Sequence, residues 1–338
     1  MWTRRLRSRA RLLSVFLPVT LGLSLVVALG LVGVGRTAPA SQDRPDRPAS
    51  REYVDIASVA PAPTPQAGPG ASTGSYAEDC GRNTEGHRNA DNVVFSPGVP
   101  GGAHHTHDYI GNRSTNAHST NASLASAATT CEDGDHSAYY WPVVRRLDRA
   151  GADADAVGGG RDGNTGAIVT AASVRVEFRG NPAGPVVAMP RFLRLVTGDP
   201  VAHLNSLPQV HAQWGCSGHP ERFTTRYTRC PAGSGVTRTF DFPSCWDGLN
   251  IDSADHRGHV VFPAAGGICP QNTFPVPQLR VTVGYDLPPG TPYAVDSFPE
   301  QVRDPKTDHA LFVNVMTERQ MAQVVGCLNE GRNCRGDR

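Results

Sequence analysis

Short segments in which apolar and polar residues alternate dominate the chain after residue 80. Residues 173–178 and 278–285 alternate apolar with charged or polar side chains, the period-two pattern of half-buried β-strands. Further short apolar segments lie between clusters of glycine, proline, asparagine and aspartate, which favour turns. These further candidate strands are residues 185–189, 192–196, 210–214, 259–262 and 310–315. With 36 glycines and 28 prolines among 338 residues, the chain has little room for long helices.

One helix is predicted near the C-terminus. Residues Thr317 to Gln320 fit a capping box, and four apolar residues follow at helical spacing. These four are Met321, Val324, Val325 and Leu328. The helix is expected to end near Gly331. Many short strands and one C-terminal helix predict a mainly β fold, a β-sandwich or jelly-roll-like single domain with long, disulfide-pinned loops.

The first 76 residues have a different character. Five arginines among the first 11 residues precede an uncharged apolar run from Leu12 to Gly35, which is typical of a signal peptide or an N-terminal membrane anchor over residues 1–36. Residues 37–76 are rich in proline, alanine, serine and glycine, which predicts a disordered linker. The globular domain is then residues 77–338. The arginines favour an extracytoplasmic domain, either secreted or anchored by its N-terminal segment.

Charge and cysteine content narrow the class of protein. The net charge of +1 from 32 basic and 31 acidic residues argues against nucleic acid as a partner. Eight cysteines in an exported chain favour disulfides. The short loop from Cys327 to Cys334 suggests one bridge, whereas pairing of the other sequence neighbours is one arrangement among many. Those neighbours are Cys80 with Cys131, Cys216 with Cys230, and Cys245 with Cys269. No nucleotide-binding motif is present, which disfavours nucleotide-driven chemistry.

A glycine-flanked loop at residues 101–112 carries candidate chemistry. If the backbone there is extended, His105 and His107 point to the same face. Two imidazoles on one face can chelate a divalent metal or bind a sugar hydroxyl, and Asp108 can orient a ring through its second nitrogen. Acid-base catalysis by these histidines and a purely structural, hydrogen-bonded role remain alternatives.

A second such loop spans residues 242–259. A carboxylate beside an imidazole tunes its pKa toward neutrality, as general acid-base catalysis requires. Trp246 offers a flat surface for a sugar ring. In the alternative interpretation the aspartates cap turns and the tryptophan belongs to the core. The carboxylates and imidazoles of this loop are those of Asp247, Asp252, Asp255, His256 and His259.

These motifs, taken in order, resemble the family named domain of unknown function 1996 (DUF1996). The resemblance covers about residues 90 to 328. It implies no agreed activity, and it implies a cell-wall or polysaccharide setting. The residues that carry it are 95–98, 105–108, Gly111-Asn112, 140–142, 242–248, Asp252, 255–259, 277–279 and 309–314.

We expect the two loops to become neighbours around one cleft. The leading hypothesis is a hydrolase directed at cell-envelope or other polysaccharide that uses a His/Asp site. The alternatives are a non-catalytic carbohydrate- or wall-binding module, with Trp246, Tyr109 and Tyr140 as stacking surfaces, and a metal-binding protein with His105 and His107 as ligands of a divalent metal. The expected catalytic residues are His105, His107, Asp108, Asp255, His256 and His259. The expected substrate-binding residues are Tyr109, Asn112, Trp246, Asp247, Asp252 and His309.

Overall fold

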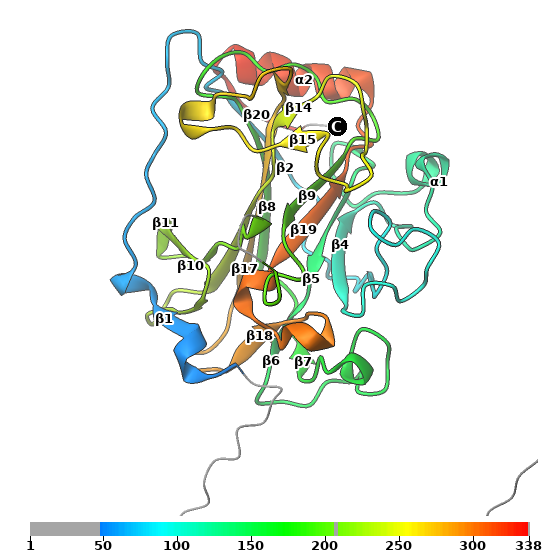
Figure 1. Ribbon diagram of the computed structural model, residues 1–338, viewed down its shortest axis with the longest axis vertical. Coiled ribbons are helices and arrows are strands. Elements are labelled where there is room, and N and C mark those ends of the chain that lie inside the picture. Colours follow the sequence, from blue (N-terminus) through cyan, green and yellow to red (C-terminus); the bar gives the residue numbers. More distant parts are fainter. Residues whose placement is uncertain (1–47, 206–208, 337–338) are drawn as a thin grey trace, which may run out of the picture. The chain divides into compact units, whose positions relative to one another are not determined.

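A seven-stranded sheet is the largest sheet of the protein (Figure 1). The structure is a computed structural model that describes residues 48–205 and 209–336. The strands β17 and β8 pair antiparallel along their length, from Gln278 with Arg179 to Gly284 with Ser173, so the two alternating segments are confirmed as strands. Across the sheet the order is β11 (His219–Thr224), β10 (Trp214–Cys216), β13 (Val236–Asp241), β17 (Gln278–Tyr285), β8 (Ser173–Arg179), β2 (Ser75–Glu78) and β20 (Asn333–Arg335).

A five-stranded sheet forms the second layer. Its strands β4, β5 and β19 are buried along their whole length. Both β4 and β19 run antiparallel to β5, which lies between them, so they are parallel to each other and begin at the same end of the sheet. The order is β3 (Arg88–Asn89), β4 (His107–Gly111), β5 (Ala138–Pro142), β19 (His309–Val313) and β9 (Arg194–Gly198).

The two sheets pack face to face through aromatic side chains. Phe178 of β8 lies against Phe312 of β19, with ring centroids 6.2 Å apart, and Trp141 of β5 stacks on Phe240 of β13 at 6.4 Å. All four side chains are at most 1% exposed. The predicted mainly β, sandwich-like domain is thereby confirmed, since alternate residues of both sheets meet in one core.

Smaller elements surround the sandwich. Two three-stranded sheets consist of β15 (Val260–Val261), β14 (Cys245–Trp246) and β16 (Phe274–Pro275), and of β18 (Tyr293–Val295), β6 (Val144–Arg146) and β7 (Ala167–Ile168). The 3-10 turns are η1 (Ser50–Glu52), η2 (Ile56–Ser58), η3 (Gly160–Asp162), η5 (Ala265–Gly267), η6 (Pro299–Gln301) and η7 (Pro305–Thr307).

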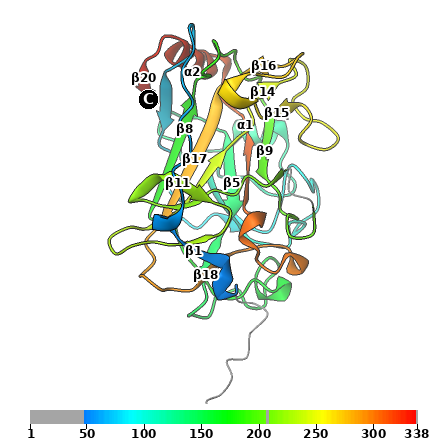
Figure 2. The same cartoon turned by 60° about the vertical axis from the view of Figure 1, so that its left-hand side comes forward.

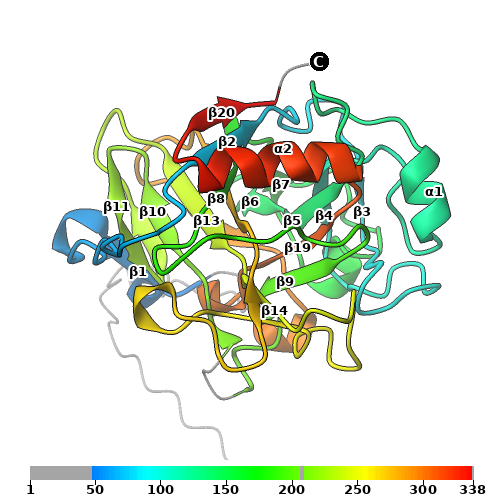
Figure 3. The same cartoon turned by 90° about the horizontal axis from the view of Figure 1, so that it is seen from above.

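The predicted C-terminal helix is confirmed as α2 (Glu318–Asn329). The Thr317 side chain accepts the Gln320 backbone N–H, and the Gln320 side chain accepts the Thr317 N–H, which is the expected capping box. Met321, Val324 and Leu328 are buried, and seen from above α2 crosses one end of the sheets (Figure 3). A second, short helix, α1 (Asn121–Ser126), is largely polar and buries Leu124.

The remaining strand predictions differ in outcome. Residues 192–196, 210–214, 259–262 and 310–315 overlap β9, β10, β15 and β19. Residues 185–189 form no strand, because prolines at positions 185 and 190 lack backbone donors. There, the Val186 N–H donates to the Asn329 side chain instead of to a neighbouring strand.

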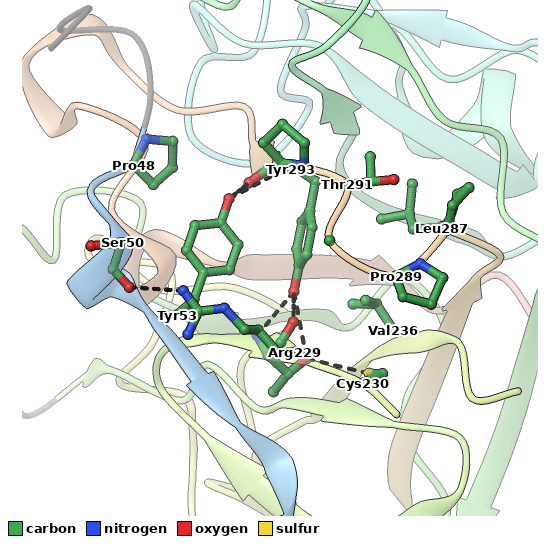
Figure 4. Close-up of a pocket in the computed structure, with 14 residues that line it drawn as sticks. Pro48, Ser50, Tyr53, Arg229, Cys230, Val236, Leu287, Pro289, Thr291 and Tyr293 are labelled. Atoms are coloured by element: carbon green, nitrogen blue, oxygen red, sulfur yellow. Dashed lines mark hydrogen bonds between the residues drawn. The ribbon is translucent and has the colours of Figure 1, made fainter. Parts of the chain in front are cut away.

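Residues 48–76, which the sequence predicts to be part of a linker, contact the domain. Strand β1 (Tyr53–Asp55) pairs parallel with β12 (Tyr227–Arg229), and the Ile56 side chain is fully buried. Tyr53 donates a hydrogen bond to the Tyr293 carbonyl, which places β1 beside β18 (Figure 2). The two tyrosines line a pocket of about 310 Å³ (Figure 4), and their rings meet edge to face with centroids 5.6 Å apart.

The signal peptide or anchor predicted over residues 1–36 lies outside the described residues. Within the described ranges, none of the helices has the length and apolar character needed to cross a membrane. The four disulfides join sequence neighbours, as Cys80–Cys131, Cys216–Cys230, Cys245–Cys269 and Cys327–Cys334.

Candidate metal centre

Three histidines meet at the end of the five-stranded sheet. His107 begins β4 and His309 begins β19, and the shared starting edge of these strands brings the two rings together. His105 reaches in from the preceding loop. Its Nε2 lies 3.0 Å from Nε2 of His107 and 3.2 Å from Nε2 of His309. All three side chains are at most 2% exposed.

The outer nitrogens of two rings fix which atoms face inward. Nδ1 of His107 lies 3.0 Å from the Asp91 carbonyl, and Nδ1 of His309 lies 2.8 Å from the Thr307 carbonyl. A carbonyl oxygen only accepts, so these Nδ1 atoms carry the proton and each Nε2 presents a lone pair. Nε2 of His105 can donate to only one of the two, so hydrogen bonding alone does not satisfy the cluster.

The spacing of the inward nitrogens matches that of metal ligands. Two imidazole nitrogens on a tetrahedral zinc ion, with bonds of about 2.0–2.1 Å, lie about 3.3 Å apart. The candidate ligand atoms of the three histidines all lie within 4.8 Å of one another. Carbonyls on the outer nitrogens orient ligating histidines in the same way. The donor set therefore fits a divalent transition metal such as Zn²⁺.

Burial keeps these histidines neutral. Desolvation lowers the pKa of His107 to about 4, and it lowers the pKa of His105 and His309 well below the usual value. Proximity to His107 lowers the pKa of both other rings further. A neutral imidazole is the form that binds a metal, whereas acid-base catalysis near pH 7 favours a pKa close to 7.

Two buried ion pairs hold the backbone on either side of the cluster. Arg238 is fully buried and binds Asp308, which precedes His309, and also the Pro142 carbonyl at 2.7 Å. Arg145 binds Asp296 at 2.7 Å, and an oxygen of Asp296 accepts the Thr106 N–H at 3.4 Å. Each pair thus fixes a residue next to one of the three histidines.

The cluster opens into a pocket of about 440 Å³. Among the described residues, His105 and His309 line it together with Asp199, Arg257 and Asn92. Phe95 and Phe298 form apolar parts of its wall. Sequence analysis missed Asp199 and Arg257. Arg257 lies between two predicted site residues, but Asp199 follows β9 in a segment without any recognisable motif.

The two histidines of the second loop, His256 and His259, form hydrogen bonds outside the three-histidine cluster. Nδ1 of His256 lies 2.9 Å from Asp252, and the ring packs edge-on against Phe95. His259 is buried, and its two nitrogens lie 2.9 Å from the Ser253 hydroxyl and 2.7 Å from the Arg194 carbonyl. Thus the second loop reaches the pocket through Arg257 rather than through an imidazole.

Three predicted acidic residues have local partners. Asp108 accepts from Arg88 at 2.6 Å and from Asn83 at 2.8 Å. Asp255 accepts from Ser253 and from the Arg257 and Gly258 N–H groups, which lowers its pKa. Asp247 accepts the Leu249 and Asn250 N–H groups. These carboxylates stabilise turns or pair with neighbours, as in the structural interpretation of the loops.

The remaining predicted residues also form local hydrogen bonds. The Tyr109 hydroxyl lies 2.7 Å from Oδ1 of Asn89 and 2.8 Å from the Asp91 carbonyl, and it can donate to one of them. Asn112 donates to the Leu124 and His136 carbonyls, and the indole of Trp246 donates to the Asn250 carbonyl. The Asp91 carbonyl is also the partner of Nδ1 of His107, so Tyr109 supports the cluster indirectly, whereas the bonds of Asn112 and Trp246 do not involve it.

Fold and site together define a disulfide-bonded β-sandwich with a buried three-histidine centre beside a pocket. Residues 91–310 match the family described as domain of unknown function (DUF1996), and the chain belongs to this family. The matched range includes all three histidines. No curated protein and no solved structure is detectably similar to the chain.

Proposed function

We propose that this protein is a metal-dependent hydrolase in which His105, His107 and His309 bind a divalent transition metal ion. The observation that carries this proposal is the approach of His105 Nε2 to the two other Nε2 atoms, at 3.0 and 3.2 Å. Such an ion acts as a Lewis acid and lowers the pKa of water, so that a nucleophile is available at neutral pH.

The position of the pocket supports catalysis over a purely structural metal. Structural zinc sites have four protein ligands, whereas catalytic sites with three keep a position open. Two of the three histidines line the pocket, so a substrate there is within reach of the centre. Asp199, 6% exposed, is the carboxylate among the described lining residues. Its Oδ1 accepts the Val201 N–H at 2.9 Å, and we assign this carboxylate as the group that accepts or returns a proton.

We propose polysaccharide or cell-wall glycan outside the cytoplasm as the substrate. The arginine-rich, apolar N-terminus and the four disulfides support an extracytoplasmic location. The amide-bearing residues Asn205 and Gln209 line the pocket, together with Phe95 and Phe298. Amides bind hydroxyls and aromatic rings pack on the apolar faces of sugars.

The geometry gives less support to a non-catalytic carbohydrate-binding module. Tyr109 and Tyr140 are at most 1% exposed and stack on each other, with ring centroids 5.0 Å apart. Neither ring presents a face to a sugar.

Metal analysis tests the proposal directly. Protein purified without a histidine tag should contain about one equivalent of Zn²⁺ or a similar ion by elemental analysis, because three neutral ligands are preorganised. His107→Ala and His309→Ala should lose the metal. His104→Ala is the matched control, since this exposed histidine pairs with Asp162 and should leave the metal content unchanged.

Activity completes that test. Release of reducing ends from cell-wall polysaccharide should stop on chelation and return with Zn²⁺. Asp199→Asn should retain the metal and lose activity. Metal-free protein that takes up no ion from Zn²⁺, Co²⁺ or Cu²⁺ solutions would contradict the metal centre, and loaded protein without activity on any glycan would contradict the hydrolase.

A further inference from the structure

Arg257 differs from the other arginines that are at least partly buried. Among the described residues, each of those others has a carboxylate oxygen within 4.0 Å, whereas Arg257 has none. The paired arginines are Arg88, Arg145, Arg146, Arg179, Arg194, Arg222, Arg238, Arg280 and Arg303. Asp199 and Asp255 act on Arg257 only from beyond ion-pair distance. Because a partly desolvated cation without a direct ion pair is unfavourable, this exception indicates a binding role.

The contacts of Arg257 hold its guanidinium at the pocket wall. Nη2 donates to the Gly198 carbonyl at 2.7 Å, and the guanidinium carbon lies 5.8 Å from the centroid of the Phe95 ring. Burial lowers the pKa of Arg257, and Asp199 opposes this effect. The guanidinium carries five N–H donors, and one of them is used in the bond to Gly198.

The guanidinium is held next to the three-histidine centre. Gly198, which anchors it, pairs directly with His309 between β9 and β19. Arg257, His105 and His309 all line the same pocket. An anionic group bound by Arg257 therefore lies beside the candidate metal ligands.

The pocket favours a singly charged anion. Asp199 lines the same cavity and is 6% exposed, so it repels a doubly charged phosphate more than a carboxylate. A guanidinium also matches the planar geometry of a carboxylate in a bidentate pair. Asn205 and Gln209, which also line the wall, carry amides that can pair with hydroxyl groups around that carboxylate.

We propose that Arg257 makes this pocket a binding site for carboxylate-bearing sugars, that is, uronic acids or glycans that contain them. The inference rests on the proposed function for the reaction carried out on such a sugar, but its binding is independent of the metal. It assigns Arg257 as the residue that selects acidic over neutral glycans.

Matched ligand pairs test this assignment in titrations of the full domain followed by NMR or calorimetry. D-glucuronate should bind at least about tenfold more tightly than D-glucose, a difference of about 1.4 kcal/mol, since the carboxylate adds a charge-assisted pair. Arg257→Met should remove this difference, and Arg257→Lys should restore part of it. Arg222→Met, which removes an arginine paired with Glu221, is the control and should bind as the wild type does.

Further ligands distinguish the sources of the anion. N-acetylglycine paired with N-acetylglycinamide represents a peptide carboxylate, and inorganic phosphate represents a dianion. Tighter Arg257-dependent binding of either one than of glucuronate overturns the sugar assignment, and equal binding of glucuronate and glucose overturns the role of Arg257. Titrations of metal-free and Zn²⁺-loaded protein keep the two proposals apart, because Arg257-dependent binding can persist if the metal centre fails.

Discussion

The histidines of this protein have different roles because their surroundings in the fold differ. His104 is exposed and pairs with Asp162, and both ring nitrogens of His259 have partners in its own loop and in β9. Only His105, His107 and His309 turn their Nε2 atoms toward one another. Sequence spacing explains the first two of these, since His105 and His107 are two residues apart, but no local signal links them to His309.

Gly198 is the residue that lies directly opposite His309 between β9 and β19. It has a φ of +80°, and a Cβ there would lie 2.2 Å from the Asp308 carbonyl oxygen and 2.7 Å from Cα of His309. Gly198→Ala should therefore displace the start of β19 and weaken metal binding by at least about tenfold, in addition to the cost of about 1 kcal/mol for alanine at this φ.

Calorimetric metal titration and thermal denaturation measure both effects. Gly163→Ala is the matched control, because Gly163 also has a φ of +80° but a Cβ added there would have no neighbouring atom within 4 Å. It should lose similar backbone stability and retain metal affinity. Equal metal affinity in both variants would show that His309 does not depend on this close approach.

Arg257 and Asp199 line the pocket but could not be identified as site residues from the sequence. Arg257 lies inside a loop that the sequence marks as chemically rich, yet its lack of a carboxylate partner becomes visible only when the ion pairs of the folded chain are known. Asp199 has significance only because β9 ends opposite His309.

At the scale of elements, burial decided which strands could be predicted. β8 and β17 alternate apolar with polar residues, and their outward side chains reach solvent, so the period of two is visible in the sequence. β4 reads His-Asp-Tyr-Ile-Gly and is buried on both faces, so that pattern is lost. The helix α2 was predictable to its N-cap, because a capping box and an amphipathic face are both local signals.

A buried acidic cluster joins β2 to β5 across the two sheets. The hydroxyl of Tyr139 lies 3.0 Å from Glu78 and 2.9 Å from Asp135, and it can donate to only one of them. No arginine or lysine among the described residues lies within 4.0 Å of either carboxylate. Burial, and the nearby acids, raise the pKa of Asp135 to about 6 and that of Glu78 well above its usual value.

This cluster should make the protein less stable as the pH rises from about 4 to about 6. In that interval the unfolded chain releases the proton of Asp135 while the folded protein retains it, so the free energy of unfolding falls with pH. Asp135→Asn should remove this part of the pH dependence and raise stability at pH 7 by on the order of 2 kcal/mol.

Urea unfolding at several pH values measures the difference between variant and wild type. Asp148→Asn is a suitable control, because this exposed aspartate has a lowered pKa through Arg146 and should not change the slope above pH 4. A wild-type slope that persists in Asp135→Asn would assign it to other groups.

At the scale of the whole molecule, amino-acid composition did not indicate that residues 48–76 contact the domain. Residues 48–76 are rich in proline and alanine, yet Tyr53 and Val54 lie in strand β1, and Ile56, which begins η2, is fully buried against the domain. The average composition of the segment does not reveal that three of the four residues from Tyr53 to Ile56 are apolar. By contrast, the even cysteine count predicted a disulfide-bonded domain correctly.

Ile56→Ala tests whether this segment belongs to the cooperative domain. Removing a fully buried isoleucine side chain should lower the free energy of unfolding by about 2–5 kcal/mol if the segment unfolds with the rest. Ile268→Ala, at a position 62% exposed, is the control and should cost much less. Chemical denaturation of both variants gives the comparison, and equal stabilities would indicate a segment that detaches without cost.

The separation of the three histidines along the chain has a consequence for biogenesis. His309 follows His105 by 204 positions, and β19 must insert between β5 and β9 before its first residue reaches the other two rings. Under the proposed export and metal binding, a chain that is still emerging lacks that last ligand, so coordination by all three histidines would await synthesis and release of nearly the entire polypeptide. Metal binding would then occur late in folding, and it would distinguish completely folded molecules from incompletely folded ones.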